Sequence, residues 1–208
     1  MMRGHREPYP MRCSILQAAA LLALAGLAAP AAAKVVDATD SGFAVTADYD
    51  IAVPPDALWA MLVQPELWWS AEHSWSGDAA NFSLNPVAGG CFCERLVTPG
   101  SIDDHEEEVK YRANTVEHAR VLYADSGKLL RLSGALGPLQ SEAVTGTLSF
   151  TLTPGPTNSS KLRMDYIVGG YSRIPLKNVA PAVDKVMTEQ MVRLKEAAEK
   201  SVGQKAVR

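Results

Sequence analysis

Glu94 and His105 are the side chains in this sequence best suited to acid–base chemistry. Glu94 shares one face of a predicted strand with Phe92, and His105 shares one face of the next strand with Tyr111. If both apolar faces look inward and the turn is centred on Pro99-Gly100, Glu94 lies opposite His105 with Cβ atoms about 5 Å apart. A carboxylate held by an imidazole can orient a polar ligand group or act as acid and base. The alternatives are a salt bridge at the sheet rim and a register that separates the two residues.

Cys91 and Cys93 are a second candidate pair, because residues two apart on a strand point to the same face. Their expected separation of about 6.5 Å is at the limit of disulfide geometry. We therefore expect free or oxidised small core residues, with a strained redox pair as the alternative. The remaining candidates, His73 and His118, lie in polar surroundings and are predicted to be surface residues.

Metal and phosphate chemistry have little support in the sequence. The acidic run 103–108 lacks the glycine and alternating ligands of a calcium loop, so we interpret it as a solvated hairpin end. The usual zinc spacings, a Gly-rich phosphate loop, a Gly-x-Ser-x-Gly elbow and a His-Glu-x-x-His motif are all missing from the sequence. We predict no metal, no cofactor and no nucleophilic hydrolase activity.

Residues 1–33 have the pattern of a secretory signal peptide. Arginines among the first twelve positions precede an apolar run over 15–29, which is followed by a proline and three alanines. We predict cleavage between Ala33 and Lys34 and a periplasmic or secreted location. The apolar run is short and Ala-rich for a stable membrane span, although an uncleaved anchor is the alternative. Met11 is an alternative start.

The mature chain would have 175 residues, which suits one domain with a single core. Its 17 basic and 22 acidic residues give a net charge of −5, which argues against nucleic acid or anionic membrane as the main partner. We expect a linker over 34–42, one domain over 43–200 and a polar tail over 201–208. The oligomeric state is left open.

The positions of the apolar residues predict an α+β fold. The segment Leu176–Lys200 is predicted to be a helix about 37 Å long, with an apolar stripe that needs a large surface to cover it. Two short helices are expected, from Pro55 and over Pro65–Trp69. Seven antiparallel strands joined by hairpin-length links would curve around the long helix and enclose a space. The predicted strands are 42–53, 81–84, 91–97, 105–116, 129–134, 144–152 and 162–168.

Four short segments, taken with this order of elements, resemble the START-like or SRPBCC superfamily. They are Val53–Trp59, Pro65–Trp69, Ala88–Gly90 before a strand, and Val183–Met187. The resemblance covers about residues 43–198 and implies the helix-grip fold of the birch-pollen allergen. Many bacterial members are of the polyketide cyclase/dehydrase or lipid-transport type. The matching motifs are structural, so they indicate a fold more strongly than an activity.

These observations lead to three hypotheses of function. The first is carriage of a small hydrophobic or amphipathic molecule in a cavity between the sheet and the C-terminal helix. The second is a cyclase/dehydrase-type enzyme with Glu94 and His105 as acid and base, and the third is a small-cavity protein that binds a partner. The expected ligand-binding residues are Trp59, Trp69, Phe92, Glu94, His105, Tyr111, Phe150, Tyr166, Met187 and Met191.

Overall fold

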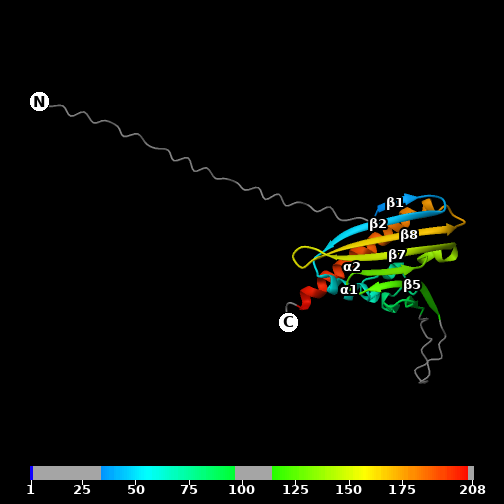
Figure 1. Cartoon of the computed structure of the whole chain (residues 1–208), viewed down its shortest axis with the longest axis horizontal. Helices are drawn as coiled ribbons and strands as arrows, with labels where there is room; N and C mark the ends of the chain where they lie inside the picture. The colour runs from blue at the N-terminus through cyan, green and yellow to red at the C-terminus, as the bar shows by residue number, and fades with distance from the viewer. Residues whose placement is uncertain (2–33, 97–113, 206–208) are drawn as a thin grey trace, which may run out of the picture. The chain divides into compact units, whose positions relative to one another are not determined.

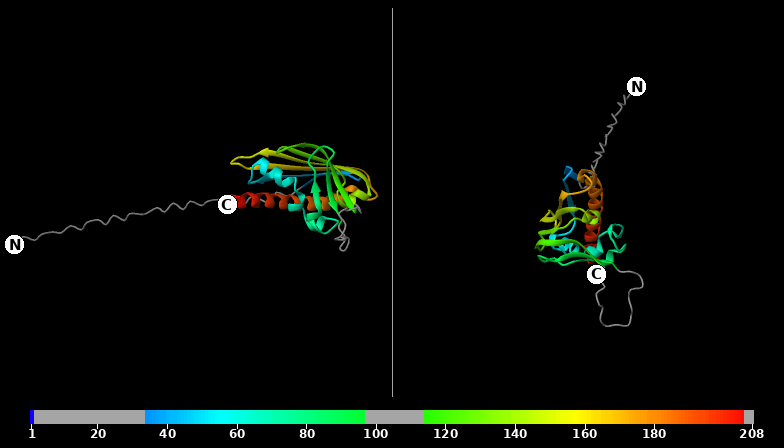
Figure 2. Two further views of the ribbon diagram at one scale, coloured as in Figure 1. Left: turned by 90° about the horizontal axis from the view of Figure 1, so that it is seen from below. Right: turned by 90° about the vertical axis from the view of Figure 1, so that its right-hand side faces the viewer.

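A computed structural model describes Met1 and residues 34–96 and 114–205 of the 208-residue chain. Within these ranges, eight antiparallel strands form one curved sheet in the order β1-β2-β8-β7-β6-β5-β4-β3 (Figure 1). The long helix α2 lies along one face of this sheet, as the turned views show (Figure 2). The α+β, helix-grip architecture predicted from the sequence is confirmed.

The elements have the following bounds. The strands are β1 (Lys34–Ala38), β2 (Gly42–Ile51), β3 (Phe82–Leu84), β4 (Cys91–Arg95), β5 (Thr115–Asp125), β6 (Leu129–Ser133), β7 (Ala143–Pro154) and β8 (Ser160–Tyr171). The α-helices are α1 (Pro55–Leu62) and α2 (Leu176–Lys205), and the short 3-10 turns are η1 (Pro65–Leu67), η2 (Ala71–His73), η3 (Ala79–Asn81) and η4 (Gly137–Ser141).

Regular alternation produces the long strands at the centre of the sheet. β2 pairs with β8 over its whole length, from Gly42 opposite Gly169 to Ile51 opposite Ser160. Their inward side chains are almost fully buried, whereas the outward side chains of β2 include Asp48. The contrast between a buried face and a solvent-exposed face defines the register of the strands. A slip of one residue would move the buried side chains into solvent and the polar side chains into the core.

The apolar stripe of α2 does two different things along its length. Met187, Met191 and Leu194 are almost completely buried against the sheet. Val179 and Val183, nearer the start of the helix, are only half-buried and face a cavity. The expectation that the stripe is buried along its whole length is therefore wrong at Val179 and Val183, although Leu176 at the start of the helix is fully buried.

Two strand predictions need correction. The expected linker 34–42 contains β1, which pairs antiparallel with β2 and adds an eighth strand. The expected strand 105–116 lies mostly outside the described residues, and β5 instead runs over Thr115–Asp125. The alternation rule missed β5 because this strand contains two irregularities in its pairing.

The first irregularity in β5 is a bulge at His118. Cys93 pairs with Glu117 and Phe92 pairs with Ala119, so His118 has no partner of its own on β4. The extra residue turns His118 inward together with its neighbour Ala119, and both are buried. The imidazole of His118 is thus buried inside the fold although the chain on either side includes the exposed residues Glu117 and Arg120.

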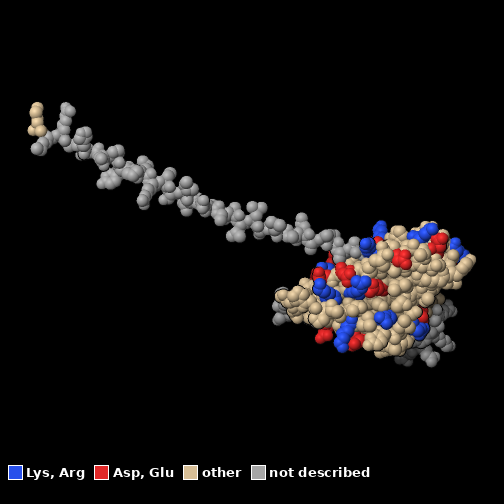
Figure 3. Space-filling model, turned by 45° about the horizontal axis from the view of Figure 1, so that its top comes forward, with Lys and Arg blue, Asp and Glu red and all other residues tan. Residues whose placement is uncertain are grey.

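The outer face of the sheet carries charges of both signs, interspersed in the view of Figure 3. Arg163 on β8 contacts Asp48 at 3.2 Å and Asp165 at 3.0 Å. These carboxylates, and the guanidinium hydrogen bonds they accept, raise the pKa of Arg163 above its ordinary value. This part of the surface therefore has no strong field of one sign.

Membrane insertion through a helix finds no support in the described part of the chain. None of its helices combines the length and the apolar character needed to cross a bilayer.

Candidate functional site

A cavity of about 690 Å³ lies between the sheet and the N-terminal half of α2. Its walls come from the segment 69–75 around η2, the segment 136–142 around η4, the end of β8 and one face of α2. The apolar part of the wall includes Leu139, Val183 and Met187, and His118 lines the same cavity. This volume is typical of a site for a small organic ligand.

Glu94 is completely buried behind His118, where it accepts three hydrogen bonds. The ring Nε2 of His118 lies 2.8 Å from its Oε2 atom. The backbone N–H groups of Trp75 and Ser76 donate to the same carboxylate at 3.1 and 2.5 Å. One side chain of β4 thereby holds both a side chain of β5 and the loop that follows η2.

These hydrogen bonds keep Glu94 ionised. Burial alone would raise the pKa of its carboxyl, but the hydrogen bonds from Ser76, Trp75 and His118 together lower it below the ordinary value. Burial lowers the pKa of His118, and the raising effect of Glu94 does not fully offset it. At neutral pH the pair is therefore a carboxylate and a neutral imidazole whose Nε2 carries the proton.

Aromatic rings hold the imidazole in place. The His118 ring lies against Phe82 and Phe92, with centroid separations of 5.1 and 5.2 Å. Phe92 in turn contacts Trp69, whose side chain lines the cavity. The ring is consequently held by packing on its faces and by Glu94 at its edge.

Tyr166 supports the opposite wall. Its hydroxyl donates to the carbonyl oxygen of Gly134 at 3.1 Å and accepts from the N–H of Leu136 at 3.0 Å. Burial raises the pKa of Tyr166 to about 12, so the hydroxyl stays protonated at neutral pH. Both bonds hold the segment that leads into η4.

Charged and apolar residues meet where the cavity opens. Arg173 pairs with Glu142 at 2.6 Å, and its backbone N–H donates to the same carboxylate at 2.8 Å. Trp75 and Ile174 line the cavity although their side chains are 55% and 54% exposed. The cavity is thus apolar inside, with an exposed apolar and charged rim.

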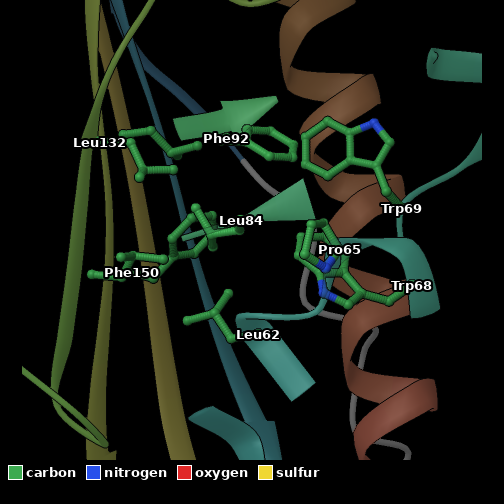
Figure 4. A pocket seen from close by; sticks show the side chains of 10 residues that line it. Leu62, Pro65, Trp68, Trp69, Leu84, Phe92, Leu132 and Phe150 are labelled. Carbon is green, nitrogen blue, oxygen red and sulfur yellow. The ribbon is translucent and has the colours of Figure 1, made fainter. Parts of the chain in front are cut away.

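The predicted ligand-binding residues are only partly gathered in this cavity. Trp69, Tyr166 and Met187 line it, and Glu94 lies behind His118. Phe92 and Phe150 instead line a neighbouring apolar crevice of about 10 Å³, shown in Figure 4, which is too small for an organic ligand. The other predicted residues do not contribute to the large cavity as described: Trp59 packs at the edge of the core, Met191 is buried in it, and His105 and Tyr111 lie outside the described residues.

The predicted pairing of Glu94 with His105 is wrong in its register. Glu94 lies opposite Phe82 on one side and Val116 on the other, and the imidazole that its carboxylate binds is that of His118. The prediction that His118 is a surface residue is also wrong, because its side chain is only 5% exposed. The sequence does contain a signal, which is a shift in the alternation of apolar residues. Ala119 and Val121 have odd numbers and point inward, whereas the apolar residue before the bulge, Val116, has an even number.

Cys91 and Cys93 are joined by a disulfide, with Cα atoms 5.4 Å apart. They lie on the side of β4 opposite Phe92 and Glu94 and are half-buried, so they are neither free nor core residues. The Cα separation is shorter than the value of about 6.5 Å expected for a fully extended strand.

A metal centre is not apparent in the described ranges, where three or more His, Cys, Asp or Glu side chains do not gather around one point. The arrangement at Glu94 and His118 offers instead a hydrogen-bonding and proton-transfer pair next to an apolar space.

Comparisons with known proteins support the fold but name no function. No family model and no curated protein matches the chain. Mll3558 from Rhizobium loti is 14% identical with a TM-score of 0.51, over 75% of this chain and 96% of its own. A Rhodobacter sphaeroides protein is 16% identical with a TM-score of 0.50, over 83% of this chain and 98% of its own. Truncated norcoclaurine synthase from Thalictrum flavum is 14% identical with a TM-score of 0.47, over 80% of this chain and 96% of its own.

Acid is expected to destabilise the domain through Glu94 and His118. The pKa of each is lower in the folded chain than its ordinary value, so the unfolded chain binds more protons as the pH falls. The contribution of His118 should be lost first, below about pH 6.5, and that of Glu94 as the pH falls from about 4.3 through its folded pKa. Urea midpoints measured between neutral pH and about pH 2 should decline in this order.

The His118→Phe variant provides the control. Its urea midpoint should decline less steeply than that of the wild-type protein in the first part of this range, where the imidazole titrates. An unchanged slope in the variant would show that His118 does not cause the first loss of stability.

Proposed function

We propose that this domain binds a small hydrophobic or amphipathic molecule in the cavity between the sheet and α2. The observation that carries the proposal is the cavity volume of about 690 Å³ between the sheet and α2. Protein interiors are normally close-packed, so an unfilled space of this size is unusual. Its volume and apolar walls are those of a site for a drug-sized ligand.

Supporting observations come from the composition of the walls. Leu139, Val183 and Met187 offer apolar surface inside, while Glu142 and Arg173 stand at the rim. A molecule with an apolar body would replace water along the interior walls, and this displacement supplies the main free energy of binding.

We also propose that the chain is a secreted member of the START-like or SRPBCC superfamily, of the polyketide cyclase/dehydrase and lipid-transport type. The helix-grip fold and the four segments given above support this assignment. The fold alone does not indicate which ligand is bound, because one fold hosts many functions.

Val183→Asp tests the cavity directly. The substitution places a carboxylate on the cavity wall, so the affinity for naphthalene, measured by calorimetry, should fall roughly ten- to a hundredfold. Val192 is also half-buried on α2 but does not line the cavity, so Val192→Asp should change the affinity much less. Equal losses in the two variants, or a wild-type protein that binds no apolar probe and carries no ligand in native mass spectrometry, would contradict the proposal.

We further propose that the protein is exported and cleaved between Ala33 and Lys34. β1 begins at Lys34, so cleavage there would leave every described strand in the mature chain. N-terminal sequencing of protein isolated from its native source should begin at Lys34. A first residue of Met1 or Met11 would contradict the proposal.

A second candidate function is an acid–base enzyme that uses the same cavity. The observation in its favour is the buried Glu94–His118 pair, in which the neutral imidazole lines the cavity and the carboxylate orients it. With a polyketide-type substrate, Glu94→Gln and His118→Gln should each lower turnover by roughly a hundredfold or more with little change in binding. If the two variants change only the affinity for the ligand, and the wild-type protein shows no turnover, the carrier function is favoured.

A further inference from the structure

The polar side chains on the cavity wall differ in how far they are already engaged. The Tyr166 hydroxyl uses its proton on Gly134 and accepts from Leu136. At the rim, Glu142 and Arg173 bind each other. These groups offer a buried ligand few new hydrogen bonds.

His118 is different because it is a buried polar side chain on the wall with hydrogen-bonding capacity left. Its Nε2 atom is 2.8 Å from the Glu94 carboxylate, which keeps the proton on that nitrogen. Nδ1 of a neutral imidazole then carries a lone pair and can only accept. Among the described residues, Glu94 is the one hydrogen-bond partner of the His118 side chain.

We propose that His118 Nδ1 accepts a hydrogen bond from a hydroxyl group on an otherwise apolar ligand. The site would therefore select alcohols and phenols over hydrocarbons, ethers and carboxylates. An ether has no proton to give, and a carboxylate would bring a second negative charge close to Glu94. This inference rests on the proposed function, since it names the polar group of the molecule that the cavity holds.

Four probes with one ring system test the selection. Naphthol, methoxynaphthalene, naphthalene and naphthoate would be titrated by calorimetry at neutral pH against protein expressed from the full sequence. Naphthol is expected to bind about tenfold more tightly than methoxynaphthalene and naphthalene, equivalent to about 1.4 kcal/mol. Naphthoate is expected to bind more weakly than naphthalene.

Two variants locate the hydroxyl contact. His118→Phe keeps an aromatic ring between Phe82 and Phe92 but has no acceptor, so the preference for naphthol over its ether should disappear. Ser74, also half-buried on the cavity wall, donates its hydroxyl proton to the Ala71 carbonyl, and Ser74→Ala should retain the preference. If the preference survives in His118→Phe or disappears in Ser74→Ala, the proposed contact is overturned.

The wild-type measurements decide the question even if His118→Phe does not fold. Equal affinities for naphthol and methoxynaphthalene would overturn the selection of hydroxyl groups while leaving ligand binding in the cavity intact. Failure of all four probes to bind would instead overturn the proposed function, and the selection with it. Tighter binding of naphthoate than of naphthol would show that the site selects anions.

Discussion

The buried carboxylate of Glu94 is the interaction on which the arrangement of the site depends. An ionised carboxylate without partners in the interior would cost several kcal/mol, so its location requires hydrogen bonds from its surroundings. The N–H groups of Trp75 and Ser76 and the imidazole of His118 provide them. The same three bonds fix the loop after η2 and the imidazole of His118, both of which border the cavity. The need to hydrogen-bond one buried carboxylate therefore determines the position of two parts of the cavity wall.

This arrangement requires an irregular sheet. The bulge at His118 brings an extra residue to the inner face of β5, directly beside Glu94 on β4. Directly after β6, the backbone of Gly134 lies very close to the backbone of β5 at the bulge. A Cβ atom on Gly134 would lie 2.4 Å from the His118 carbonyl oxygen. Glycine at position 134 therefore permits the close approach of β6 to the bulge. Its carbonyl oxygen accepts the hydrogen bond from Tyr166.

The fold was predictable wherever the chain alternates regularly, and the site was not. Regular apolar periods are visible in the sequences of β2, β7, β8 and α2. Each period shows directly which side chains of the element face the core. His118 was missed because a bulge reverses the alternation between Val116 and Val121, and a pattern read from regular strands cannot show which residue is inserted. The cavity was predicted only as a consequence of the fold, because a valine facing a cavity and a valine facing the core give the same helical period.

A cavity of this size persists because its walls are held from behind and not by contact across the space. Gln190 of α2 accepts from the backbone N–H of Ser70, and Arg193 donates to the carbonyl of Trp68. Tyr166 holds the segment before η4 in the same way. Collapse of either wall would break these hydrogen bonds, each worth about 1 kcal/mol, and would leave the buried backbone N–H of Ser70 without its partner. The cost of breaking them opposes the gain in packing that usually closes an empty apolar space.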